Sequence, residues 1–169
     1  MDEDLAKLKE LLRNRKWWKN DLRTNLGGPQ LMRNGWKNLV TGVYSNTERS
    51  GPILELCREM LGDPSITDVC CNRGVHCGPH RDSKNYAQCS YFLMFGDFEG
   101  GALYIEEPDG LRKIDEKDTW FMFRGDRDLH CNEPIYSGTK YSVVAFARPP
   151  PVFSREGKAL RRAKQTIPA

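Results

Sequence analysis

Two histidines and one aspartate are the residues whose types and spacing best suit metal chemistry. His80 and Asp82 form an H-x-D pair, and His130 follows fifty residues after His80. Two imidazoles and one carboxylate can occupy one face of an octahedral iron(II) ion and leave the opposite face open for oxygen chemistry. The chain has only three histidines, so such a site would use two of them. Taken alone the pattern is weak, because His130 could be a loop histidine satisfied by hydrogen bonds and Asp82 a turn residue.

A cation and a hydroxyl follow ten residues beyond His130. Lys140 and Ser142 lead into the apolar segment 143–146, which we expect to be a buried strand. A lysine that points into a protein interior needs a partner, because a lone buried charge is very costly. A dicarboxylate co-substrate would be such a partner, with the Ser142 hydroxyl as a further donor. The alternative is that Lys140 faces solvent, as most lysines do.

The elements that must position these residues change type near residue 66. Leucines at helical spacing predict an amphipathic helix over 4–16, and a second helix should begin with Ser50 as its cap and Pro52 in its first turn, and end at Gly62. Five β-branched or aromatic segments then predict strands, at 66–75, 89–95, 102–106, 120–123 and 141–147. Helices followed by short strands favour an α+β fold, either an antiparallel sheet backed by helices or a jelly-roll barrel.

The length and composition fit one globular domain. The chain has 169 residues, of which 38% are hydrophobic and 29% charged, a composition typical of folded soluble proteins. We expect the domain to span 1–150, with 1–65 as mainly helical support and 66–148 as the β core. A loop is expected at 24–35, and a basic extension at 151–169.

The net charge of +3 is unevenly distributed, because both ends of the chain are basic. Residues 13–23 carry a net charge of +4, and residues 148–169, where a helix is expected at 154–164, carry +5. Basic ends suit contact with a polyanion such as nucleic acid, although basic terminal helices are often simply solvated. Trp17 and Trp18 lie in the first basic stretch, where we expect them to cover the core rather than stack on bases.

No sequence feature indicates export or membrane insertion. No apolar segment approaches the roughly 20 residues of a membrane helix, and the acidic start has no apolar signal-peptide core. We therefore expect an intracellular protein, nuclear or cytoplasmic, that is not secreted and is monomeric. The six cysteines contain no C-x-x-C pair, so reduced thiols, mostly in the core, are expected in place of a zinc site.

Several short motifs, in a consistent order, resemble one family of iron enzymes. They are an H-x-D-x-x-N pattern over 79–85, Ser90-Tyr91, a G-D-x-x-G-G-x-L segment within 95–103, and the closing series Phe123-Arg124-Gly125, His130, Pro134, Gly138 and Tyr141-Ser142. In these motifs the chain resembles the Fe(II)/2-oxoglutarate-dependent dioxygenases, most of all the TET/J-binding-protein branch that oxidises the methyl group of modified pyrimidines. The resemblance covers about 70–147, and residues 1–65 give no such match.

The resemblance implies both a fold and a set of site residues. The fold would be a double-stranded β-helix (jelly-roll) core with the N-terminal helices packed on one sheet. Fe(II) would be held by His80, Asp82 and His130, with 2-oxoglutarate and O2 as co-substrates. The residues implied for 2-oxoglutarate are Lys140, Ser142 and Tyr91. The residues implied for the substrate are Asn85, Arg81 and Arg148.

Two positions depart from the pattern of that branch. Lys140 stands where an arginine usually anchors 2-oxoglutarate, and it offers a point charge in place of a two-pronged donor. Arg148 stands where a base-contacting histidine is often found. These departures leave the identity of the co-substrate and of the base open.

The resulting hypothesis is oxidation of the methyl group of a 5-methylcytosine-like pyrimidine in nucleic acid, with DNA favoured over RNA. The basic ends and Asn85 support it, and a target base within a duplex would have to be flipped out. The main alternative is an Fe(II)/2-oxoglutarate hydroxylase of a protein side chain or a small molecule, because the same motifs would serve that reaction. A binding module without turnover is a third reading.

Overall fold

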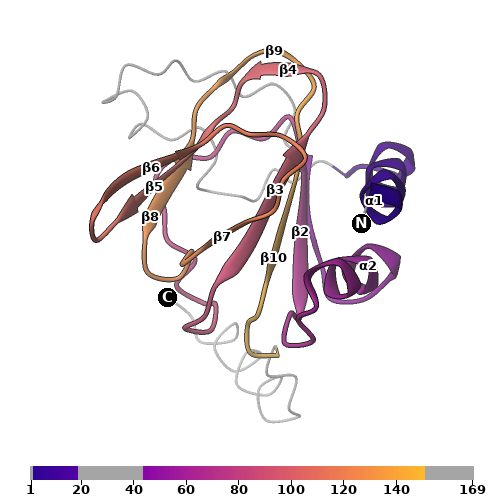
Figure 1. Ribbon diagram of the computed structural model, residues 1–169, viewed down its shortest axis with the longest axis horizontal. Coiled ribbons are helices and arrows are strands. Elements are labelled where there is room, and N and C mark those ends of the chain that lie inside the picture. Colours follow the sequence, from indigo (N-terminus) through magenta and orange to yellow (C-terminus); the bar gives the residue numbers. More distant parts are fainter. Residues whose placement is uncertain (1, 19–43, 151–169) are drawn as a thin grey trace, which may run out of the picture.

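The computed structural model describes residues 2–18 and 44–150 (Figure 1). The expected loop at 24–35 and the basic extension at 151–169, with its expected helix at 154–164, lie outside the described residues. The described part contains the helices α1 (Asp2–Asn14) and α2 (Pro52–Leu61). Its strands are β1 (Tyr44–Glu48), β2 (Asp68–Arg73), β3 (Ser90–Phe95), β4 (Phe98–Gly100), β5 (Leu103–Glu107), β6 (Gly110–Ile114), β7 (Phe121–Phe123), β8 (Leu129–Asn132), β9 (Ile135–Gly138) and β10 (Tyr141–Phe146).

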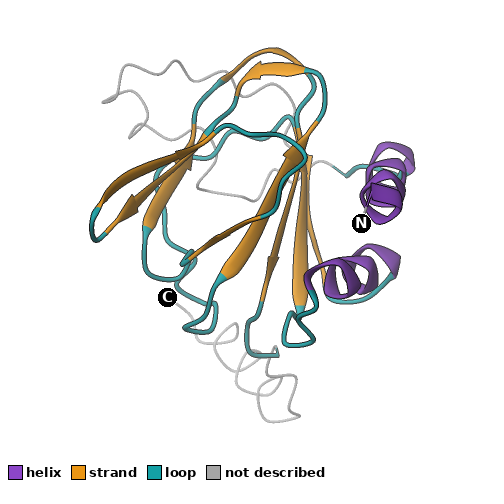
Figure 2. Cartoon of the chain, in the orientation of Figure 1, coloured by secondary structure: helices purple, strands orange, loops and turns teal. Residues whose placement is uncertain are grey.

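The described strands form two antiparallel sheets and a two-stranded ribbon. The larger sheet has the order β1-β2-β10-β3-β7, the smaller one has the order β6-β5-β8, and β4 pairs with β9. Figure 2 shows both helices on one side of the molecule, beside the larger sheet and away from β5, β6 and β8. This is the α+β arrangement expected from the sequence, with the helices packed on one sheet.

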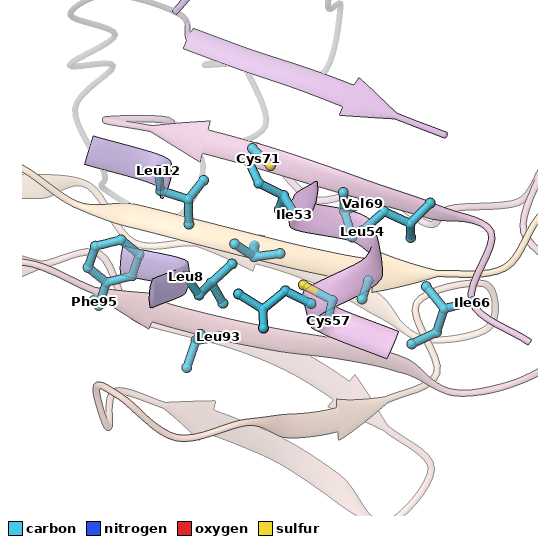
Figure 3. Packing of buried hydrophobic residues seen from close by; sticks show 13 residues of the cluster. Leu8, Leu12, Ile53, Leu54, Cys57, Ile66, Val69, Cys71, Leu93 and Phe95 are labelled. Carbon is cyan, nitrogen blue, oxygen red and sulfur yellow. The ribbon is translucent and has the colours of Figure 1, made fainter. Parts of the chain in front are cut away.

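One face of the larger sheet packs against the helices. Because side chains alternate along each strand, every second residue of β3 and β10 points to this face. Val143 and Ala145 of β10, with Leu93 of β3, are fully buried on this face. They pack with Leu8 and Leu12, which are one helical turn apart on α1 and are also fully buried (Figure 3). Burying each leucine stabilises the fold by about 1.5–3 kcal/mol, so these two contacts attach α1 to the sheet.

The opposite face of the larger sheet turns toward the smaller sheet. A second buried cluster lies there, and it joins Phe92 and Met94 of β3 to Leu103 and Ile105 of β5. Neighbouring residues of β3 therefore belong to two different hydrophobic clusters, one on each face of the larger sheet. Residues 93 and 95 face the helices, and residues 92 and 94 face the space between the sheets.

Some local expectations need correction. The N-cap of α2 is Gly51, not Ser50, and no side chain caps this helix end. Gly51 has a φ of 107°, which favours glycine. Gly62 ends the helix in the left-handed conformation, as expected. Trp17 packs against the first core, whereas Trp18 is 56% exposed and does not cover it.

Five strands were not predicted from the sequence. β1 lies in a segment expected to be mainly helical, and β4, β6, β8 and β9 are short. None of them has a run of β-branched or aromatic residues, so their strand conformation depends on pairing with a neighbour.

Candidate metal centre and its cavity

A backbone pairing brings the two candidate histidine ligands together. The His80 N–H donates to the His130 carbonyl at 3.0 Å, and the His130 N–H donates to the His80 carbonyl at 3.0 Å. The two residues form an antiparallel bridge, so their side chains lie on the same face. The ring centroids are 4.3 Å apart. Two histidines that are fifty positions apart in the sequence are therefore in direct contact.

Asp82 completes the group. Its N–H donates to the Gly125 carbonyl at 2.8 Å. Its carboxylate oxygens lie 3.5 Å from His80 Nε2 and 3.4 Å from His130 Nε2. A Cβ on Gly125 would come within 2.8 Å of Asp82 Oδ2, so the absence of a side chain there leaves room for the carboxylate. One ligand atom from each of the three residues lies within 4.8 Å of the others.

Hydrogen bonds orient both imidazoles with one nitrogen toward the group. His80 Nδ1 is 2.7 Å from the Gly78 carbonyl, and His130 Nδ1 is 2.9 Å from the Asp128 carbonyl. A carbonyl only accepts, so each Nδ1 carries a hydrogen, and each Nε2 is the ring nitrogen that faces the Asp82 carboxylate. This is the usual way in which a protein orients a histidine that binds a metal.

The charge of Asp82 also suits a cation. Burial by itself would raise the pKa of its carboxyl, but hydrogen bonds and charge interactions with His130 and His80 hold that pKa well below the ordinary range. A metal ion would take the place of the hydrogens between these rings and the carboxylate, and two imidazole nitrogens with one carboxylate are a donor set that fits a divalent metal such as iron(II).

The three residues lie in the wall of a cavity of about 570 Å³. Of the residues implied for co-substrate and substrate, it is lined by Ser142, Asn85, Arg81 and Arg148. It is also lined by residues that sequence reasoning did not single out, including Thr47, Cys70, Asn72, Cys77 and Asn132. Residues 70–72 read Cys-Cys-Asn, so no alternation of polar and apolar residues in the sequence marked the face of this strand that lines the cavity.

Lys140 is buried behind this wall, on the same side of the chain as Ser142. It is 2% exposed, which excludes the alternative that it faces solvent. Its Nζ donates to the Gly101 carbonyl at 2.5 Å and lies 5.6 Å from the centre of the Phe92 ring. Burial lowers the pKa of Lys140 to about 8. Among the described residues no carboxylate lies within ion-pair distance of this ammonium, and Glu133 acts on it only through a weaker charge interaction that raises its pKa.

Arg148 is held by a buried carboxylate. Its Nε lies 2.7 Å from Oδ2 of Asp68, which is fully buried. Arg49 Nε lies 3.1 Å from the other oxygen of the same carboxylate. Asp68 therefore forms ion pairs with both Arg49 and Arg148. Its bond to Nε fixes the position of the Arg148 guanidinium at the cavity wall.

Arg81 and Asn85 belong to the segment that follows the first histidine. Arg81 is exposed, and its Nε donates to the Arg127 carbonyl at 2.9 Å. The Asn85 N–H donates to the Asp82 carbonyl at 2.9 Å. This turn holds the Asn85 backbone against Asp82, and Asn85 lines the same cavity as the candidate metal ligands.

The expectation that Tyr91 binds a co-substrate needs correction. Its hydroxyl donates to Asp63 Oδ2 at 2.8 Å, and its ring packs against the core beneath the helices. Tyr91 shares the helix-facing side of β3 with Leu93, whereas Phe92 lines the cavity. A difference of one residue in a strand moves a side chain to the other face.

Neither described helix is long and apolar enough to span a membrane.

No protein-family model and no curated protein matches this chain. Among solved structures, NgTET1 in complex with 5mC DNA matches at 22% identity with a TM-score of 0.43, over 60% of this chain. This chain spans only 43% of that protein. The likeness is too weak to carry a conclusion about substrate.

Three solved structures match more fully. A prolyl-4-hydroxylase from Pseudomonas putida is 14% identical over 87% of this chain and 85% of its own, with a TM-score of 0.54. A 2OG-Fe(II) oxygenase family oxidoreductase from Burkholderia pseudomallei is 14% identical over 86% and 82%, with a TM-score of 0.57. A Trichoplax adhaerens prolyl hydroxylase, in complex with a peptide fragment of hypoxia inducible factor, is 16% identical over 86% and 77%, with a TM-score of 0.51. The chain therefore shares the double-stranded β-helix fold of these three structures, as the resemblance in its motifs implied.

Proposed function

We propose that this chain is an Fe(II)- and 2-oxoglutarate-dependent dioxygenase. The observation that carries the proposal is the convergence of His80, Asp82 and His130 within 4.8 Å, with both Nε2 atoms directed at the carboxylate. Three protein ligands leave room on iron(II) for a co-substrate and O2. With iron bound, 2-oxoglutarate would be oxidised to succinate and CO2, one oxygen atom of O2 entering succinate and the other a substrate C–H bond.

The buried lysine supports 2-oxoglutarate as the co-substrate. The ammonium of Lys140 has no carboxylate partner in the described chain and is nearly inaccessible to water. A carboxylate from a ligand would supply the missing counter-ion and offset the cost of burial. Ser142, on the same side of the chain and lining the cavity, would add a hydroxyl donor to the same group.

We infer that the substrate is nucleic acid, because the cavity is basic. The charged residues that line it are Arg81, Lys84 and Arg148 on the positive side and Asp82 on the negative side. Arg81 and Lys84 are exposed, so their charge is available to attract a phosphate backbone. The Asn85 amide and the Arg148 guanidinium would then donate to a base. The proposed reaction is oxidation of the methyl group of a 5-methylcytosine-like pyrimidine, in DNA ahead of RNA, with the base flipped out or single-stranded.

Hydroxylation of a protein side chain is a second candidate. It is favoured by the prolyl-4-hydroxylase of Pseudomonas putida, whose fold matches this chain over 87% of its length. The same candidate metal ligands and the same buried lysine would serve either substrate, so the two functions differ only in what the outer part of the cavity accepts.

One assay separates these candidates. The protein would be incubated with Fe(II), 2-oxoglutarate and air, together with either a single-stranded oligonucleotide that contains 5-methylcytosine or a pool of proline-rich peptides. We expect succinate release with the oligonucleotide and a hydroxymethylated nucleoside by mass spectrometry. Hydroxylated peptide without any modified nucleoside would instead establish the second candidate. His80→Ala is the control, and equal turnover by this variant would refute the metal assignment.

A further inference from the structure

A row of three polar side chains crosses the larger sheet at one level. Ser45 of β1 pairs in register with Asn72 of β2, and Asn72 pairs in register with Ser142 of β10. Their exposed fractions are 1%, 8% and 7%. Asn72 and Ser142 line the cavity. Buried polar groups are retained only where their hydrogen bonds are made, so the direction of each bond in this row carries information.

The bonds have a defined direction. Ser45 Oγ donates to Asn72 Oδ1 at 2.7 Å, and the Cys70 thiol donates to the same oxygen at 3.5 Å. The end of the amide that faces Ser45 and Cys70 is the carbonyl oxygen Oδ1, which accepts from both. The opposite end is then the nitrogen, and Asn72 Nδ2 donates to Ser142 Oγ at 3.3 Å. An amide nitrogen cannot accept, so Ser142 is the acceptor in this bond.

The last hydroxyl is consequently left as a donor. A serine hydroxyl carries one hydrogen, and Ser142 already uses its oxygen to accept from Asn72. Within residues 2–18 and 44–150 no acceptor takes the Ser142 hydrogen. Because Ser142 lines the cavity, a bound ligand can take it. Lys140 precedes Ser142 by two residues, which puts both on the same side of the chain.

We propose that Ser45 and Asn72 are positioning residues that hold the Ser142 hydroxyl as a donor to a carboxylate of 2-oxoglutarate beside Lys140. The inference rests on the proposed function, since it assigns a role to residues at the co-substrate end of the same cavity. Without the hydrogen bond from Asn72, the Ser142 hydroxyl would be free to rotate its hydrogen away from the ligand. Lys140 would then be the only one of these two residues that donates to the carboxylate. Loss of one hydrogen bond to a charged group weakens binding by roughly tenfold or more.

A double-mutant cycle on co-substrate binding tests the inference without turnover. The protein would be loaded with Mn(II), which replaces iron without oxygen chemistry, and the Kd of 2-oxoglutarate would be measured by calorimetry. We expect Asn72→Ala and Ser142→Ala each to raise this Kd by roughly tenfold. In the Ser142→Ala background, Asn72→Ala should add less than about twofold, because the donor that it positions is already absent. Equal effects of Asn72→Ala in both backgrounds would overturn the inference.

Two further variants separate positioning from general loss of stability. Ser45→Ala should weaken 2-oxoglutarate binding, whereas Ser45→Thr keeps a hydroxyl and should restore it. Ser90→Ala removes another buried hydroxyl, 1% exposed on β3, and should leave the Kd unchanged. Mn(II) affinity should be the same in all variants. If the wild-type protein binds Mn(II) but not 2-oxoglutarate, the proposed co-substrate is refuted; if it binds both but the cycle is additive, only the role of Ser45 and Asn72 is refuted.

Discussion

Replacing Lys140 by methionine should remove a pH-dependent contribution to stability and abolish 2-oxoglutarate binding. Burial lowers the pKa of Lys140 to about 8, against roughly 10.4 for a lysine in an unfolded chain. Between these two values the unfolded state binds more protons than the folded state, so stability rises with pH. Below pH 8 both states are charged, and the folded state carries the full cost of burying the ammonium. Methionine has a similar length and no charge, and it suits the apolar surroundings of Phe92 and Phe98.

The magnitude follows from the two pKa values. Raising the pH from 7 to 10 should increase the free energy of unfolding of the wild-type protein, relative to Lys140→Met, by about 2.5 kcal/mol. Other groups that titrate in this range are common to both proteins and cancel in the difference. The groups that act most directly on Lys140 are His76, Cys77 and Glu133, and they are also unchanged. Lys7→Met, which removes an exposed lysine of α1, controls for the loss of a positive charge.

Urea denaturation at pH 7 and pH 10, with and without 2-oxoglutarate on the Mn(II)-loaded protein, measures both effects. A ligand at a hundred times its Kd stabilises a folded protein by about 2.7 kcal/mol. We expect that increment at pH 7 in the wild-type protein and none in Lys140→Met. Identical pH dependence in the two proteins would show that the ammonium is not held at a depressed pKa. An unchanged increment from 2-oxoglutarate would show that Lys140 does not anchor it.

The remaining predictions concern the metal ligands, the co-substrate and the groups around them. His80→Ala should abolish Mn(II) binding in calorimetry while circular dichroism stays unchanged, and retained binding would contradict the metal site. The Kd of 2-oxoglutarate should rise about tenfold for each pH unit above 8 as Lys140 loses its proton, whereas Lys140→Arg should bind with no such loss up to pH 10. Asp68→Asn leaves two arginines without their buried counter-ion and should lower the free energy of unfolding by about 3 kcal/mol in urea titrations; no change would mean that the ion pairs are not formed. Gly125→Ala places a Cβ within 2.8 Å of a carboxylate oxygen of Asp82 and should weaken Mn(II) binding by roughly tenfold or more, while an unaltered Kd would argue that this carboxylate is not a ligand.

Residue types and local spacing determined the chemistry that this chain can offer. His80 and Asp82 are two residues apart, so their proximity needs little more than a turn. Strand periodicity alone places Lys140 and Ser142 on one side of the chain. The two helices and five of the strands are also visible in the sequence, because each has its own apolar pattern and end signals.

Only the tertiary structure decided which residues meet. His130 joins His80 through a backbone pairing across fifty residues, and no local pattern encodes that contact. The packing of α1 and α2 on one face of the larger sheet put Tyr91 on the helix side. On the other side, Gly101, Phe92 and Phe98 surround the buried ammonium of Lys140. Ser45 and Asn72 became neighbours because β1, a polar strand, pairs with β2. A sequence pattern predicts which residues form a strand. It does not specify which strands pair with one another or which of their faces becomes buried, and these contacts depend on both.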